Sequence, residues 1–161
     1  MNETYTLQPI GRIQASDGRF ILQLEPDCAP ALAELDGFSH INILWWAHLF
    51  DDPDYRALRL SESPYKDAPP QMGIFATRSP IRPNLIMHTV AAVLHIDPLL
   101  GQVHIAYIDA EDGTPLLDIK PYQPCTDRVR DVAVPDWCAA WPSWLEESGA
   151  FDWTAVFDNA R

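Results

Sequence analysis

The feature that constrains the fold most is an almost unbroken apolar and aromatic run over residues 38–50, FSHINILWWAHLF. A run of this kind fits a β-strand that is buried on both faces better than it fits an amphipathic helix. The few polar members of the run, His48 among them, are therefore conspicuous. We expect an interior strand here, with its polar residues as candidates for a site.

Proline and the hydrophobic pattern extend this prediction to most of the chain. There are 15 prolines against 7 glycines, which favours fixed turns and extended segments over long helices. Alternating apolar residues and turn signals predict further strands over residues 5–13, 19–24, 73–77, 89–96, 102–109 and 115–119. Helical spacing appears over residues 27–35, and a loop with one helical turn near residues 55–58 is expected over residues 51–71.

Tryptophan dominates the last part of the chain. From residue 135 onward, aromatic and apolar residues recur every three to four positions, which predicts a short tryptophan-rich helix interrupted by Pro142. We expect this helix to pack on the barrel or sheet.

Length and composition are those of one globular domain. The 161 residues are 47% hydrophobic and 21% charged, which excludes the disordered class. The first residues carry an acid and no apolar run, and no stretch approaches a membrane span, so we expect a cytoplasmic protein without a membrane partner. Three widely spaced cysteines fit neither a disulfide framework nor a zinc cluster, and we expect reduced thiols.

The net charge of −12 opposes a polyanionic partner, since nucleic-acid binding depends on cationic contacts to phosphates. The charge is unevenly distributed, however. Residues 73–130 hold 5 bases and 6 acids, whereas the segments on either side of them are strongly acidic. The middle of the chain, where the motifs lie, is therefore nearly neutral.

The first of these motifs is a loop over residues 73–84 that contains Arg78 and Arg82 between prolines. Guanidinium groups on a stiff loop suit a carboxylate or a phosphate. The alternative is a surface loop whose arginines pair with the abundant acids.

The second motif covers residues 109–122, DAEDGTPLLDIKPY. Asp112 and Gly113 signal a tight turn, and a strand follows in which Asp118 and Lys120 can face the same side as a pair. The alternative is a plain hairpin with a structural ion pair. Common nucleotide, metal and hydrolase signatures are absent, and the five histidines do not form a ligand set, so no metal is expected.

Together, these two motifs carry a resemblance. With PIGRI at residues 9–13 and FSHI at residues 38–41, they match in order, over about residues 8–124, the pattern of the YaeB/TsaA family. The chain resembles this family, whose tRNA methyltransferase members methylate the modified adenosine beside the anticodon with S-adenosylmethionine.

The resemblance implies a fold, a cofactor and an assembly. The fold would be mostly β (β-rich α+β), a closed pseudo-barrel of mixed strands with a short tryptophan-rich C-terminal helix. Residues 1–161 would form one S-adenosylmethionine-binding domain, with the motifs over about residues 5–125 and a C-terminal extension over residues 131–161. The domain would pair into a homodimer, with the cofactor near the subunit junction.

The resemblance also implies a set of site residues. Those that would bind S-adenosylmethionine are His48, Leu49, Arg78, Ser79, Arg82, Asn84, Glu111, Asp112, Gly113, Thr114 and Lys120. Methyl transfer from a sulfonium is an in-line displacement and needs no protein nucleophile, but a carbamoylated adenine nitrogen needs a base to take its proton. Asp118 and Tyr122 are the candidates for this catalytic role.

Departures from the family pattern keep other functions open. The family reads RPNPIG where this chain has Leu85 in place of proline and Met87 in place of glycine, followed by His88. If the family glycine lets the backbone approach the ligand, Met87 would narrow or reshape the pocket. The resemblance also leads us to expect no counterpart here of the C-terminal domain that longer members use on tRNA.

One alternative is therefore an S-adenosylmethionine-binding regulatory or accessory protein without tRNA activity. Another is a methyltransferase for a small molecule or a protein. Basic residues gathered at the pocket mouth would favour tRNA, and an acidic rim would favour the alternatives. The basic residues in question are Arg12, Arg56, Arg59, Arg128 and Arg130.

Overall fold

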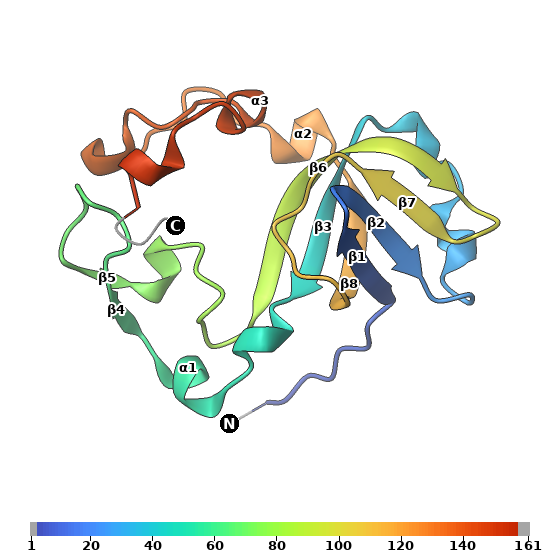
Figure 1. Cartoon of the computed structure of the whole chain (residues 1–161), viewed down its shortest axis with the longest axis horizontal. Coiled ribbons are helices and arrows are strands. Elements are labelled where there is room, and N and C mark those ends of the chain that lie inside the picture. Colours follow the sequence, from blue (N-terminus) through green and yellow to red (C-terminus); the bar gives the residue numbers. More distant parts are fainter. Residues whose placement is uncertain (1–2, 158–161) are drawn as a thin grey trace.

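Six strands form a closed β-barrel in the computed structural model, which describes residues 3–157 (Figure 1). Their order around the barrel is β1-β2-β7-β6-β3-β8, and β8 pairs with β1 to close the ring. The bounds are β1 Gly11–Ser16, β2 Arg19–Leu24, β3 His40–Trp46, β6 Ile86–Asp97, β7 Gln102–Ile105 and β8 Thr114–Pro121. A closed β-barrel is what the resemblance predicts, and the prediction is confirmed.

Every strand pair of the barrel is antiparallel, where strands of mixed direction were expected. For β1-β2 and β6-β7, short connections explain the direction, since two strands joined by a tight turn can only run antiparallel. The turn between β1 and β2 consists of Asp17 and Gly18, which have φ of 53° and 70°. This is the left-handed conformation that two-residue hairpin turns require.

The longest strand, β6, changes partner halfway along its length. Its first half, residues 86–92, pairs with β3, and its second half, residues 93–97, pairs with β7 across a register shift between Val93 and His95. Such a shift bends a strand and lets it pass from one sheet to the next. This change of partner lets the barrel close. Within the described residues, the edge of residues 86–92 that faces away from β3 has no partner strand.

The barrel interior is filled by branched aliphatic side chains that the six strands and their connections supply. The fully buried ones are Ile13, Leu22, Ile41, Ile43, Leu85, Val103, Ile105, Ile108 and Leu116. The buried Trp45 lies among them and donates a hydrogen bond from Nε1 to Thr89 Oγ1 at 3.0 Å. The interior strand predicted over residues 38–50 is therefore β3, and it ends at Trp46.

Short helices connect the strands or lie outside the barrel. Those close to the barrel are η1 Ala29–Leu32, η2 Leu35–Gly37, η3 His48–Phe50 and α2 Pro124–Asp127. The others are α1 Pro53–Ala57, η4 Ile74–Ala76, η5 Asp136–Cys138, α3 Leu145–Ser148 and η6 Trp153–Ala155. No helix within residues 3–157 is long and apolar enough to cross a membrane.

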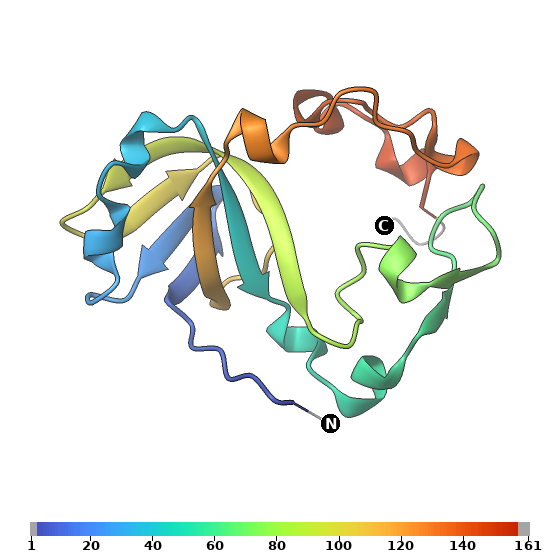
Figure 2. The same cartoon turned by 180° about the vertical axis from the view of Figure 1, so that it is seen from behind.

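Two segments, residues 51–80 and 129–157, lie together on one side of the barrel (Figures 1 and 2). We call them the arm. The first contains a two-stranded sheet of β4 Leu60–Glu62 and β5 Gln71–Gly73. The second contains four tryptophans, of which Trp137 and Trp141 contact Tyr65 of the first segment. The tryptophan-rich segment, expected to pack on the barrel or sheet, therefore packs within the arm and not on the barrel.

Two other predicted elements differ from those in the structure. The strand expected over residues 73–77 is the end of β5 followed by the 3-10 turn η4. The helix expected from residue 135 is three separate turns. Pro142, which lacks the amide proton that a continuous helix requires, lies between the first two. Cys28, Cys125 and Cys138 are free cysteines, as expected.

One polar pair lies on the outer face of β3 and β6. Asn42 is only 7% exposed, and its Oδ1 accepts a hydrogen bond of 2.7 Å from Nε2 of His88. Burial lowers the pKa of His88 below its ordinary value, the charge of Arg78 lowers it further, and Asp127 acts in the opposite direction. The neutral imidazole is therefore the form that the fold favours.

We predict that replacing Gly11 with alanine destabilises the barrel by about 1–3 kcal/mol, because an added Cβ would lie 2.2 Å from the carbonyl oxygen of Gln23. Urea unfolding followed by tryptophan fluorescence measures the change. Gly37→Ala is the matched control, since no heavy atom lies within 4 Å of its added Cβ. Equal losses in both variants would contradict the prediction.

We also predict that acid weakens the fold through His88. A histidine whose folded-state pKa is lowered binds its proton more readily in the unfolded chain, so stability is lost as the pH falls below about 6.5. His88→Gln keeps an amide that can donate to Asn42 but does not titrate. The drop in urea midpoint from pH 7.5 to pH 5.5 should be smaller in this variant, and an unchanged drop would count against the assignment.

Candidate functional site

A cavity of about 480 Å³ opens at one end of the barrel. Its volume falls in the range of about 300–1,000 Å³ that is typical of small-molecule sites. Its walls come from four parts of the chain: the barrel strands, η3 with the residue before it, the arm, and the loop that leads into β8. The lining residues are Ala15, Phe20, Trp45, Ala47, His48, Leu49, Phe50, Arg78, Pro80, Met87, Tyr107, Ile108, Asp109, Ala110, Glu111 and Thr114.

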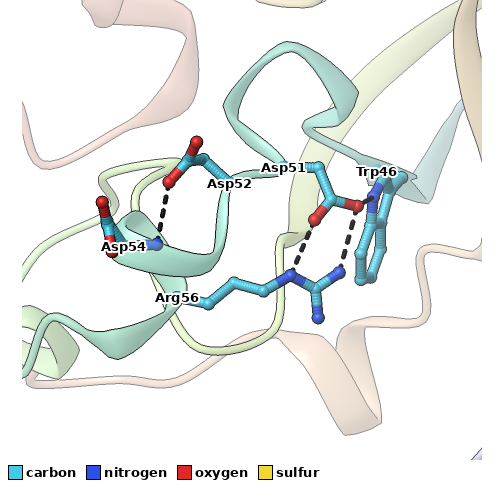
Figure 3. A network of polar contacts seen from close by, with 5 residues as sticks. All are labelled: Trp46, Asp51, Asp52, Asp54 and Arg56. Carbon is cyan, nitrogen blue, oxygen red and sulfur yellow. Dashed lines mark hydrogen bonds and ion pairs between the residues drawn. The ribbon is translucent and has the colours of Figure 1, made fainter.

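The η3 wall is held by an ion-pair network just beyond it (Figure 3). Arg56 donates to both carboxylate oxygens of Asp51, from Nε at 2.7 Å and from Nη2 at 3.0 Å. Trp46 donates from Nε1 to the same carboxylate, and the Arg56 guanidinium lies 5.2 Å from the Trp46 ring centre. The end of β3 and the start of α1 are thereby fastened together on either side of His48 and Leu49.

Arg78 reaches the cavity from the arm. The residues on either side of it are fixed: Thr77 Oγ1 donates to the carbonyl of Ile74 at 2.9 Å and accepts from the amide of Ser79 at 3.2 Å. The Arg78 guanidinium donates from Nη2 to the carbonyl of His88 on the unpaired edge of β6, at 2.6 Å. An arginine has five N–H donors, so this contact leaves others free for a ligand.

The opposite wall is the loop over residues 107–111. Tyr107 packs edge-to-face against Phe20, with ring centres 5.3 Å apart, and remains 60% exposed at the rim. Burial raises the pKa of Tyr107, and the neighbouring Asp109 carboxylate raises it further, so the phenol stays protonated at neutral pH. The rim therefore presents an aromatic surface and a hydroxyl donor.

The Asp-Gly turn predicted from the sequence fixes the end of this loop. Gly113 has φ of +77°, and its amide donates to the carbonyl of Ile13 at 2.8 Å. Asp112 Oδ1 accepts from the amide of Ala15, and Arg12 Nη1 donates to the carbonyl of Gly113, both at 2.9 Å. The turn is thus locked onto β1 and places Thr114 in the cavity wall.

The balance of charge at the cavity does not resemble a phosphate-binding surface. Arg78 is joined in the lining by two carboxylates, Asp109 and Glu111. None of the five arginines considered for a basic mouth lines the cavity within the described residues. Of these five, Arg12 donates to the Asp-Gly turn and Arg56 pairs with Asp51.

Five of the residues predicted to bind the cofactor lie around this one cavity. They are His48, Leu49, Arg78, Glu111 and Thr114. The remaining ones, Ser79, Arg82, Asn84, Asp112, Gly113 and Lys120, are outside its lining. Ser79 and Asp112 instead support the backbone of the loops that carry the lining residues.

The residues predicted to be catalytic lie farther away. Strand β8 starts at the cavity with Thr114 and runs away from it, so Asp118 is about 13 Å and Tyr122 about 26 Å along the strand direction, at about 3.3 Å per residue. Asp118 forms an ion pair of 2.6 Å with Lys120, as its alternation predicts, and Tyr122 lies beside His40. The structure does not bring Asp118 or Tyr122 to the cavity of their own chain.

Sequence reasoning missed several lining residues, notably Phe20, Trp45, Tyr107 and Asp109. Tyr107 and Asp109 could have been found, since they continue the alternation of β7 past its last buried position and precede the Asp-Gly turn. Met87, identified as a departure from the family pattern, does line the cavity.

Known proteins resemble this chain in fold and in sequence. A crystal structure of TrmO from Pseudomonas aeruginosa superposes with a TM-score of 0.65 at 29% identity, over 84% of this chain and 62% of that one. An Escherichia coli tRNA (adenine(37)-N6)-methyltransferase is 32% identical over 76% of this chain and 52% of its own length. A Pyrococcus horikoshii relative, provisionally named an S-adenosyl-L-methionine-binding protein, is 31% identical over 73% of this chain and 82% of its own.

This chain therefore spans between about half and three fifths of the longer relatives. Residues 4–128 match the family model of the tRNA-methyltransferase O N-terminal domain, which covers every part of the chain that lines the cavity. The chain belongs to this family, known also as YaeB.

Proposed function

We propose that the barrel-mouth cavity binds S-adenosylmethionine and that the protein transfers the methyl group to an acceptor. One observation carries the proposal. The arginine loop and the segment before the Asp-Gly turn, about 30 residues apart in the chain, line the same cavity together with His48. These are the segments whose motifs mark the family, and relatives bear names that refer to this cofactor or to methyl transfer.

The lining residues fit the chemical groups of this cofactor. The guanidinium of Arg78 suits the methionine carboxylate. The rings of Phe20 and Tyr107 offer an apolar wall to an adenine. The carboxylates of Asp109 and Glu111 can accept hydrogen bonds from ribose hydroxyls or from the amino group.

Bound S-adenosylmethionine supplies a methyl group activated by its sulfonium. The protein's contribution would be to hold donor and acceptor in line and to exclude water. The apolar floor of Trp45 and Met87 and the aromatic rim at Tyr107 serve this purpose. The neutral phenol of Tyr107 can donate a hydrogen bond at the rim but cannot act as a base at neutral pH.

For the acceptor, we propose the N6 nitrogen of the threonylcarbamoylated adenosine beside the anticodon of tRNA, in line with the name of the E. coli relative. Asp118 or Tyr122 would take the proton from this nitrogen. Because β8 carries both residues away from the cavity of their own chain, they would act on an acceptor held by a second copy. The proposal therefore includes a homodimer.

A second candidate function is favoured by the charge at the cavity. Asp109 and Glu111 outnumber Arg78, and the arginines that could have formed a basic mouth are not in the lining. A polyanionic acceptor gains little from such a rim. The second candidate is an S-adenosylmethionine-binding protein that regulates a partner or methylates a small molecule or protein.

We predict that Arg78→Ala weakens binding of S-adenosylmethionine by about 10- to 100-fold, the loss expected for one charge-assisted pair. Isothermal titration calorimetry with S-adenosylmethionine and with S-adenosylhomocysteine measures the change. Arg130→Ala removes an exposed arginine outside the cavity and should bind as wild type. An absence of binding by the wild-type protein would overturn the proposed function.

We predict that Asp118→Asn or Tyr122→Phe slows methylation of an anticodon stem-loop carrying threonylcarbamoyladenosine by about 10²- to 10⁴-fold, the usual effect of losing a general base. Transfer of a labelled methyl group to this RNA is the measurement. Mixing Asp118→Asn chains with Arg78→Ala chains should restore part of the activity if one site uses both copies. Cofactor binding without transfer to the RNA would favour the second candidate function.

A further inference from the structure

The last 29 described residues, 129–157, lie outside the part of the chain that matches the family, yet they pack against residues 51–80, the other segment of the arm. Six rings form what we call the aromatic cluster, namely Tyr65, Trp137, Trp141, Phe151, Trp153 and Phe157. Tyr65 is the one member from residues 51–80, and it contacts three others: Trp137 at 5.1 Å, Trp141 at 5.0 Å and Phe157 at 5.2 Å between ring centres. The cluster thus joins two segments that are about 70 residues apart.

Backbone contacts reinforce this junction. Lys66 donates from its amide to the carbonyl of Val156 at 3.0 Å and from Nζ to the carbonyl of Thr154 at 2.9 Å. Tyr65 and Phe157 form an antiparallel bridge. The aromatic contacts of Tyr65 and the hydrogen bonds of the adjacent Lys66 together fix the position and orientation of the C-terminal segment relative to residues 51–80.

Hydrogen bonds and chain connections lead from Tyr65 to the cavity. Ser63 Oγ accepts from the amide of Tyr65, and its one hydroxyl proton has two acceptors within reach, the carbonyl of Tyr65 at 3.1 Å and the sulfur of Met72 at 3.4 Å. Met72 is buried in β5. Met72 is followed by the buried Ile74, whose carbonyl accepts from Thr77, the residue before Arg78.

Arg78 therefore belongs to the arm by its backbone, while its guanidinium contacts the barrel at His88. Burial raises the pKa of Tyr65, and the positive charge of Arg78 partly offsets that rise. A displacement of the cluster would move the loop that presents Arg78 to the cavity.

We propose that residues 129–157 act as a strap that holds the Arg78 loop over the cavity through the aromatic cluster. Trp141, which contacts Tyr65, Trp137 and Trp153, is the central positioning residue. The proposal rests on the proposed function in that it takes S-adenosylmethionine as the ligand of Arg78. It makes cofactor affinity depend on residues that do not line the cavity.

The test compares Trp141→Leu with Trp144→Leu, in the full-length protein. Trp144 lies on the same segment but is 58% exposed and outside the cluster. Calorimetric titration with S-adenosylhomocysteine should show about tenfold weaker binding for Trp141→Leu, close to the loss of one charged contact, and unchanged binding for Trp144→Leu. Trp141→Phe keeps a ring in the cluster and should recover most of the affinity.

A double-mutant cycle separates positioning from general damage. In an Arg78→Ala background, Trp141→Leu should cause no further loss, because the strap acts through Arg78. An equal loss in both backgrounds, or no loss in either, would overturn the strap while leaving the proposed function intact. No binding by the wild-type protein would instead overturn the proposed function.

Trp141→Leu could unfold the arm, so a milder variant completes the test. Lys66→Met removes the Nζ contact to Thr154 and keeps the cluster and the backbone bond. We expect a smaller loss of affinity, about two- to threefold, that also disappears in the Arg78→Ala background. Losses that persist in that background would count against the strap for this variant as well.

Discussion

The change of partner within β6 is the constraint on which the rest of this structure depends. Because residues 86–92 pair with β3 and residues 93–97 pair with β7, one strand belongs to two sides of the barrel. Closing the ring in this way separates the first half of β6 from the end of β7. The loop over residues 107–111 and the side chain of Arg78 occupy that separation, and the cavity lies between them. The mouth of the barrel is therefore a consequence of how the barrel closes.

The walls of the cavity differ in how firmly they are held. The Asp-Gly turn is bonded to β1, and η3 is fastened by the Asp51 carboxylate, so both walls are extensions of the barrel. Arg78 comes from the arm, which has its own aromatic packing away from the barrel core. A ligand that binds Arg78 and the loop over residues 107–111 at once would connect the arm to the barrel. Part of its binding free energy would be used to fix the arm.

Local patterns predicted the barrel well and the arm poorly. Alternation identified the strands around Leu22 and Val103, and an unbroken apolar run identified the strand around Ile43. The Asp112-Gly113 turn was evident from its chemistry, because a left-handed glycine is a local property. The arm has no such signal. Trp141 finds its partner Tyr65 about 76 positions away, and a helical spacing of tryptophans was the nearest local interpretation. The same contrast applies to the site. Local motifs located Arg78 and Thr114, whereas the distance of Tyr122 from the cavity depends on the direction of β8 in the whole fold.

Two residues in the segment that departs from the family pattern have different effects on the cavity. Met87 and His88 are neighbours on β6, so their side chains point to opposite faces. Met87 lines the cavity, while His88 points to the outer face and bonds Asn42. Arg78 contacts the carbonyl of His88, which any residue at this position would supply. The substitutions therefore alter the space available to a ligand and leave the anchor of Arg78 unchanged, so they bear on which ligand fits more than on whether the arginine is in place.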